Sequence, residues 1–141
     1  MLIQYIVNSS LIGLAVIVHY QCLYRFTQLI PRLPFSDRFR VLAGVAAALV
    51  AHVIEVWLFG IAYYLMDGAE GWGGLTGAYD GSLLSSVYFS FTAFTTLGLG
   101  DILPEGDVRF LVGLESLTGF VLITWTASFL YMEMTKHWSN E

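Results

Sequence analysis

Three apolar segments of membrane-spanning length constrain what this chain can fold into. They cover about residues 2–24, 41–66 and 110–132. Each has at least the ~20 residues that a helix needs to cross the hydrocarbon core of a bilayer. Charged residues make up only 12% of the 141-residue chain, which excludes an ordinary soluble domain. We therefore expect an all-α membrane protein with three transmembrane helices and the lipid bilayer as its partner.

A fourth apolar stretch, residues 82–95, is too short to cross a bilayer. An apolar run of roughly 10 to 14 residues is typical of a re-entrant or buried helix. The sequence TTLGLGD at residues 95–101 follows it and must return the chain to the side from which it entered. Non-helical backbone at membrane depth is tolerated only where it is buried in protein or lines an aqueous path. The sequence therefore predicts a re-entrant helix followed by a functional loop.

The charged residues orient the spans. Five of the six basic residues fall on one side of the membrane: Arg25, Arg32, Arg38, Arg40 and Lys136. The positive-inside rule makes that side cytoplasmic, with the N-terminus outside and the C-terminus inside. Six acidic residues collect on the outer side: Asp67, Glu70, Asp80, Asp101, Glu105 and Asp107. This outer face should attract cations. The net charge of -5 argues against nucleic acid as a partner.

The alternating glycines of TTLGLGD predict an ion-binding backbone. Gly98 and Gly100 can adopt positive φ, which lets successive carbonyls point to one side of the chain. We expect the ion-binding filter to consist of Thr96, Leu97, Gly98, Leu99 and Gly100, with K+ held at the first four residues and the Thr96 hydroxyl at the inner end. One strand supplies only part of a coordination shell, so several copies must converge, and we expect a C4 homotetramer. Permeant K+ is expected, with no cofactor and no soluble substrate.

The order of spanning helix, short helix, TTLGLGD and spanning helix resembles the pore domain of the potassium channel family. The filter of that family usually reads TTVGYGD. The resemblance includes SSVYFSFTAFTTLGLGDILP and, on the third span, RFLVGLESLTGFVLITWTASFL, which is similar to small bacterial two-helix-pore channels. It implies a passive, potassium-selective channel, not an enzyme, in a bacterial inner membrane.

The resemblance and the charge pattern divide the chain into four parts. We expect an extra N-terminal transmembrane helix at 1–26, a basic cytoplasmic linker at 27–40, the pore domain at 41–132 and a short cytoplasmic tail at 133–141. The pore domain divides into an outer helix at 41–66, a pore helix at 82–95, the filter at 96–101 and an inner helix at 109–132. The connection at 67–82 holds six glycines and predicts an irregular outer loop. With so short a tail, we expect gating to arise from the membrane domain, lipid, pH or a partner.

Leu99 departs from the family pattern, because the family usually has tyrosine there. The hydroxyl that braces the filter from behind in the family is then missing. Tyr88, Thr92 and Glu115 are candidates to brace the filter instead, and Asp101 is expected at its outer mouth. Weaker bracing would relax selectivity, so a weakly selective monovalent cation channel of the same fold is an alternative.

Three further residues of the spans are candidates for gating or sensing. Gly119 lies nineteen residues after Gly100, near where family members often place a flexible glycine, so it is a gating candidate; packing through a small residue is the alternative. His52 and Glu55 share one face of the second span at membrane depth. They predict a pH-sensing pair or a structural tether. A metal site would need a third ligand, and we expect His19 at the membrane interface.

Two functions from other classes also fit parts of the sequence. The GLGD string matches the second catalytic motif of presenilin-like intramembrane aspartyl proteases, and the segment at 78–80 resembles their Tyr-Asp motif. Those enzymes carry both acids within spanning helices, whereas Asp80 falls in the glycine-rich loop and Asp101 follows the half-membrane helix. A cation-transporter subunit is the other alternative, but such subunits usually carry four pore loops in one chain. The single loop favours a channel.

Overall fold

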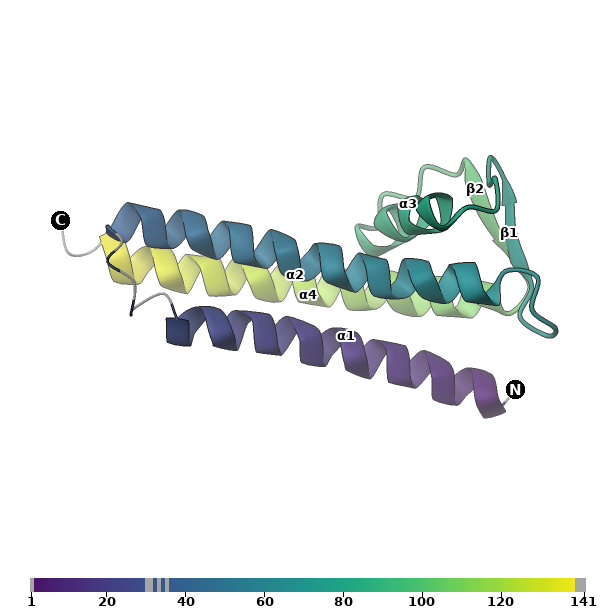
Figure 1. Ribbon diagram of the computed structural model, residues 1–141, viewed down its shortest axis with the longest axis horizontal. Coiled ribbons are helices and arrows are strands. Elements are labelled where there is room, and N and C mark those ends of the chain that lie inside the picture. Colours follow the sequence, from purple (N-terminus) through teal and green to yellow (C-terminus); the bar gives the residue numbers. More distant parts are fainter. Residues whose placement is uncertain (1, 30–31, 33, 35, 139–141) are drawn as a thin grey trace.

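Three long helices run side by side and form the body of the molecule (Figure 1). The computed structural model describes residues 2–29, 32, 34 and 36–138. The long helices are α1 (Leu2–Leu29), α2 (Asp37–Met66) and α4 (Val108–Trp138). Each is long and apolar enough to cross a membrane. A short helix, α3 (Leu83–Phe94), packs on α2 and α4 near the end of the bundle that carries the N-terminus. The expectation of an all-α membrane protein with three spans and one short helix is confirmed.

The helices extend beyond the apolar segments that predicted them. α2 begins at Asp37 rather than at residue 41, because the Ser36 carbonyl accepts the Arg40 amide at 3.1 Å and Arg40 pairs with Asp37 at 3.6 Å. α1 continues through residues 27–29, which were expected in the linker, and α4 continues to Trp138. Hydropathy locates the lipid boundary, whereas capping and local ion pairs decide where a helix ends. Residues 30, 31, 33 and 35 of the linker and 139–141 of the tail lie outside the described residues.

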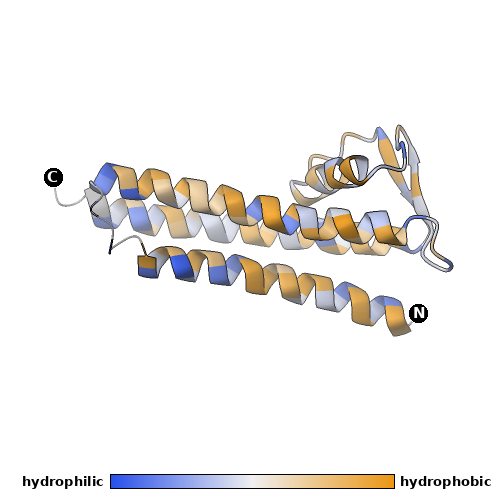
Figure 2. Cartoon of the chain, in the orientation of Figure 1, coloured by the Kyte–Doolittle hydropathy of each residue, from blue (hydrophilic) through white to orange (hydrophobic). Residues whose placement is uncertain are grey.

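Opposite charges lie at opposite ends of the bundle. The α1–α2 connection and the last turns of α4 share one end, and this end carries Arg25, Arg38, Arg40 and Lys136 (Figure 1). The other end carries the acidic connection after α2, together with α3 and two short strands. Figure 2 shows apolar residues over much of the length of the three long helices. The bundle therefore has an apolar belt between a basic end and an acidic end.

The short helix α3 reaches about a third of the way along α4, and the chain then turns back. Its start is capped by Ser82, whose Oγ accepts the Ser85 amide at 3.1 Å. Its last residue, Phe94, lies against Gly119, eleven residues into α4. At ~1.5 Å per residue this is a depth of about 16 Å, roughly half of a ~30 Å hydrocarbon core. The re-entrant helix expected from the sequence is thereby confirmed.

A two-stranded ribbon closes the acidic end of the bundle. β1 (Gly74–Gly77) pairs antiparallel with β2 (Ile102–Glu105), with Gly74 opposite Glu105 and Gly77 opposite Ile102. The prediction of an irregular loop throughout 67–82 was wrong for β1. Glycine is needed here because a Cβ on Gly77 would lie 2.4 Å from the Asp101 carbonyl oxygen. The glycines permit two backbones to approach closely, and their abundance was misread as irregularity.

Glycines also set the positions of the helices around α3. A Cβ on Gly60 of α2 would lie 2.7 Å from the Val87 Cα, and a Cβ on Gly119 of α4 would lie 2.0 Å from the Phe94 carbonyl oxygen. Small residues of this kind let helices in membranes pack at short range. The buried core forms around these crossings and includes Phe59, Phe94, Leu111 and Leu122. The depth of α3 therefore depends on two glycines.

We predict that Gly119→Ala destabilises the fold, because the new methyl group meets a backbone carbonyl that cannot move independently. Overpacking of this kind costs about 1–3 kcal/mol. Gly113→Ala on the same helix is the matched control, because nothing lies within 4 Å of the position that its new methyl group would take. Thermal unfolding of the purified protein in detergent, followed by circular dichroism, should show a lower midpoint for Gly119→Ala only. Equal midpoints for the two variants would contradict the close contact.

Candidate ion-conducting site

The backbone of residues 95–100 alternates between two conformations. Thr96, Gly98 and Gly100 have φ values of 58°, 53° and 79°. Among the described residues, Thr96 is the only non-glycine residue with positive φ. A β-branched residue in this region is strained by about 1–3 kcal/mol, and such strain concentrates at functional sites. The alternation lets the carbonyls of successive residues point to one side, as the glycine pattern predicted.

Amides of this loop donate hydrogen bonds to α3. The Gly98 amide donates to the Thr92 carbonyl at 3.0 Å, and the Thr96 amide donates to the Ala93 carbonyl at 2.9 Å. These bonds hold the loop against the last turn of α3. The carbonyl oxygens of residues 95–100 accept no hydrogen bond from the described part of the chain. Bare carbonyls at membrane depth are unfavourable unless they face water or ions, so these oxygens are available as cation ligands.

The residues predicted to form the filter are largely uncovered in a single chain. Leu97 and Leu99 are 64% and 58% exposed, and neither Gly98 nor Gly100 has a neighbour within 4 Å of the position a Cβ would take. These two glycines are therefore required by their φ values and not by crowding. One chain forms one wall and cannot surround an ion alone.

Tyr88 connects α3 to Asp101, which directly follows the predicted filter. Its hydroxyl donates to Asp101 Oδ2 at 2.7 Å. Of the three bracing candidates, Tyr88 is the one whose side chain reaches a residue adjoining the filter. Thr92 acts differently, because its hydroxyl donates to the Phe89 carbonyl within α3 while its own carbonyl accepts the Gly98 amide.

Glu115 holds the short helix rather than the filter itself. It is fully buried on α4 and accepts hydrogen bonds from the Tyr63 hydroxyl of α2 and from the Ser90 hydroxyl of α3. Ser90 also lies 2.9 Å from the Val56 carbonyl. The single Ser90 hydroxyl proton thus has two acceptors within reach, the Glu115 carboxylate and the Val56 carbonyl. The sequence indicated Glu115, but not its partners on two other helices.

His19 of α1 joins the pair of His52 and Glu55 on α2. His52 Nδ1 lies 2.9 Å from Glu55 Oε2, and His19 Nδ1 lies 2.9 Å from Glu55 Oε1. The expectation that His19 lies at the membrane interface was wrong, because its side chain is buried against Glu55, well inside the α2 span. Hydropathy locates a span but does not show which of its residues face a neighbouring helix. The contacts of this cluster with the filter region are indirect, through the Phe94 ring 5.7 Å from the His52 ring.

Gly119 and the hydroxyl residues of α4 have structural partners. Gly119 is required by its contact with Phe94, and its gating role stays a prediction. Four hydroxyls donate to carbonyls of their own helix, namely those of Ser116, Thr118, Thr124 and Ser128. These side chains are thus satisfied without any contact to pore water.

The acids proposed for a protease have separate partners. Asp80 accepts the Ser82 amide at 2.9 Å just before α3, and its hydrogen bonds to Ser82 lower the pKa of its carboxyl. Asp101 accepts from Tyr88. Asp80 therefore stays charged near neutral pH as part of a helix cap.

Comparison with known families supplies the deciding observation. A family model described as an ion channel matches residues 51–136, which is more than half of the chain. The chain belongs to this ion channel family. The matched segment contains the second half of α2, the re-entrant helix α3, the filter loop and nearly all of α4, whereas α1 lies outside it. A search of curated proteins found no match. The family supports the channel interpretation over the protease.

We predict that Glu115→Ala destabilises this ion channel far more than Glu115→Gln does. Alanine leaves the buried Tyr63 hydroxyl without its acceptor, which costs about 1–3 kcal/mol, and leaves Ser90 with only the Val56 carbonyl. Glutamine keeps an oxygen for Tyr63 and an N–H for Ser90. Thermal unfolding in detergent measures the difference. Equal decreases of the unfolding midpoint in the two variants would show that the hydrogen bonds of Glu115 do not hold α3.

Proposed function

We propose that four copies of the chain assemble around a fourfold axis and form a potassium-selective channel. The observation that carries this proposal is the alternating backbone at Thr96, Gly98 and Gly100 with carbonyls free of hydrogen bonds from the described residues. In potassium channels, four such loops replace the hydration shell of the ion with carbonyl oxygens. Residues 96–99 would form successive K+ sites, with Gly100 completing the filter. No protein cofactor is needed for this passive transport.

Exposed apolar side chains support assembly around α3. Leu84, Tyr88 and Phe91 are 73%, 40% and 40% exposed and follow one another at helical spacing on the face of α3 that is turned away from α2 and α4. Leu97 and Leu99 continue this uncovered surface into the filter. Neighbouring subunits in a tetramer would cover it, and closed rotational symmetry is the usual form of such assemblies.

Local electrostatics favour cations over anions. α3 enters from the acidic end, so its C-terminus, the negative end of the helix dipole, is directed toward the interior. Asp101 adds a carboxylate directly after the filter. We place the acidic end outside and the basic end in the cytoplasm of a cell membrane, consistent with the positive-inside rule. The resemblance to small bacterial channels suggests a bacterial inner membrane.

A weakly selective monovalent cation channel is the second candidate. Leu99 favours it, because a leucine cannot supply the hydroxyl that usually braces the filter. The bond between Tyr88 and Asp101 ties the outer end of the filter to α3 and supports the selective alternative. Selectivity depends on how firmly the carbonyl cage is held and on its field strength.

Two substitutions test the backbone mechanism. Gly98→Ala should abolish potassium flux into proteoliposomes, because alanine at φ 53° costs about 1–2 kcal/mol per subunit and disturbs all four walls. Asp101→Asn should retain most of the flux, because its side chain still accepts from Tyr88. Gly113→Ala controls for a glycine replacement in open space.

All variants should elute with the mass of the wild-type tetramer. Wild-type flux through Gly98→Ala would contradict a carbonyl filter. Loss of all flux in Asp101→Asn would instead show that conduction requires the charge of the Asp101 carboxylate.

A further inference from the structure

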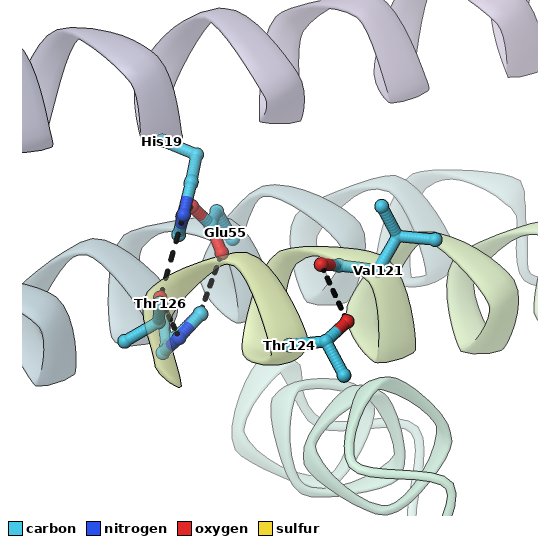
Figure 3. A network of polar contacts seen from close by, with 6 residues as sticks. His19, Glu55, Val121, Thr124 and Thr126 are labelled. Atoms are coloured by element: carbon cyan, nitrogen blue, oxygen red, sulfur yellow. Dashed lines mark hydrogen bonds and ion pairs between the residues drawn. The ribbon is translucent and has the colours of Figure 1, made fainter. Parts of the chain in front are cut away.

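A cluster of polar side chains is buried where the three long helices meet. Figure 3 shows His19 of α1 directed toward Thr126 of α4, with Glu55 of α2 beside them. The Nδ1 atoms of His19 and His52 each lie 2.9 Å from one oxygen of Glu55. On the opposite edge, Thr126 Oγ1 lies 3.0 Å from His52 Nε2 and 3.4 Å from His19 Nε2. The four residues form a closed ring.

This ring is costly for a membrane protein and lies outside the filter. His19 and Glu55 are fully buried, and the His19 ring lies 5.2 Å from the Trp125 ring. Ionisable groups at membrane depth are expensive, and apolar side chains would join the helices at lower cost. His19 also belongs to the helix that lies outside the matched ion channel segment. The ring is thus a feature added where α1 docks on the pore domain.

The donor atoms have the composition and spacing of a transition-metal site. One ligand atom each from His19, His52 and Glu55 can be chosen so that all three lie within 4.8 Å of one another. Metal–ligand bonds of about 2.0–2.2 Å in tetrahedral geometry separate ligands by roughly 3.4 Å. The present 2.9 Å contacts join the two imidazoles to different oxygens of Glu55, and side-chain shifts of about an ångström would bring one ligand atom from each residue to this spacing. Two imidazoles and a carboxylate suit zinc-class ions, whereas Mg2+ and Ca2+ prefer oxygen ligands.

Thr126 supplies the orientation that metal-bound histidines require. A ligating imidazole usually donates its other ring N–H to a nearby acceptor. The Thr126 oxygen has two lone pairs and faces the Nε2 atoms of both histidines. It can therefore hold both rings with Nδ1 directed at the shared site.

We propose that His19, His52 and Glu55 bind a divalent transition-metal ion of the zinc class, with Thr126 as a positioning residue. The ligands come from α1 and α2 together, so a bound ion fixes α1 against the pore domain. Cys22, one turn after His19, is a potential competing ligand that does not belong to the three-residue cluster. This inference concerns a site separate from the filter, and its test does not depend on conduction.

The test uses the purified full chain in detergent after treatment with EDTA. Equilibrium dialysis against Zn2+ should give one ion per chain, and Co2+ should give the visible spectrum of a nitrogen- and oxygen-ligated ion. His19→Gln and His52→Gln should each abolish stoichiometric binding. Thr126→Val should weaken binding about 10- to 100-fold, as expected for a partner of metal-bound histidines. Thr126→Ser keeps the hydroxyl and should bind the ion with the affinity of the wild type.

Two variants serve as controls. Thr124→Val removes a neighbouring hydroxyl that donates to its own helix, as Figure 3 shows for the Val121 carbonyl, and should leave affinity unchanged. Cys22→Ser should also bind normally. Absence of Zn2+ binding by the wild type, unchanged binding in both histidine variants, or loss of binding in Cys22→Ser would overturn the proposal. If a histidine variant fails to fold, the wild-type stoichiometry, the Co2+ spectrum and the Thr126 series still decide.

Discussion

Peptide groups cannot be left bare in lipid, and the whole fold depends on how the chain meets this constraint at residues 95–100. Each unsatisfied backbone group in hydrocarbon costs several kcal/mol. Two amides of the loop, at Thr96 and Gly98, donate to the Ala93 and Thr92 carbonyls of α3. Its own carbonyls have no such partner among the described residues. Carbonyls without a hydrogen bond at membrane depth need water or ions beside them, and we propose that in this ion channel they coordinate ions.

The rest of the pore domain holds this loop at the right depth. Gly60 and Gly119 let α3 approach α2 and α4, and the contact with Gly119 sets the point where α3 ends. The buried network around Glu115 joins the same three helices through polar bonds. Strand β2 directly follows the loop of residues 95–101 and pairs with β1. Just before β2, the Tyr88 hydroxyl donates a hydrogen bond to Asp101. α1 contributes no part of the filter and docks through a polar cluster centred on Glu55.

The sequence predicted the features that depend on length, hydropathy and glycine spacing. These are the three spans, the re-entrant helix and the alternating conformations at Gly98 and Gly100. It did not predict the features that depend on how each helix is rotated. The long helices are apolar on most sides, so periodicity cannot show which face meets a neighbour. For this reason the burial of His19 and the pairing of Tyr88 with Asp101 emerged only from the structure. β1 was missed because its glycines serve close backbone contact rather than a flexible turn.

The measurement that tests the central claim most directly is the reversal potential of the purified protein in planar bilayers, with potassium on one side and sodium on the other. The hydrogen bonds from the loop to α3 and the Tyr88–Asp101 bond should hold the carbonyl cage firmly. We therefore predict a reversal potential far from zero, with the sign that potassium permeation gives. A reversal near zero with clear current would contradict potassium selectivity and identify a loose cation pore with Leu99 in its filter.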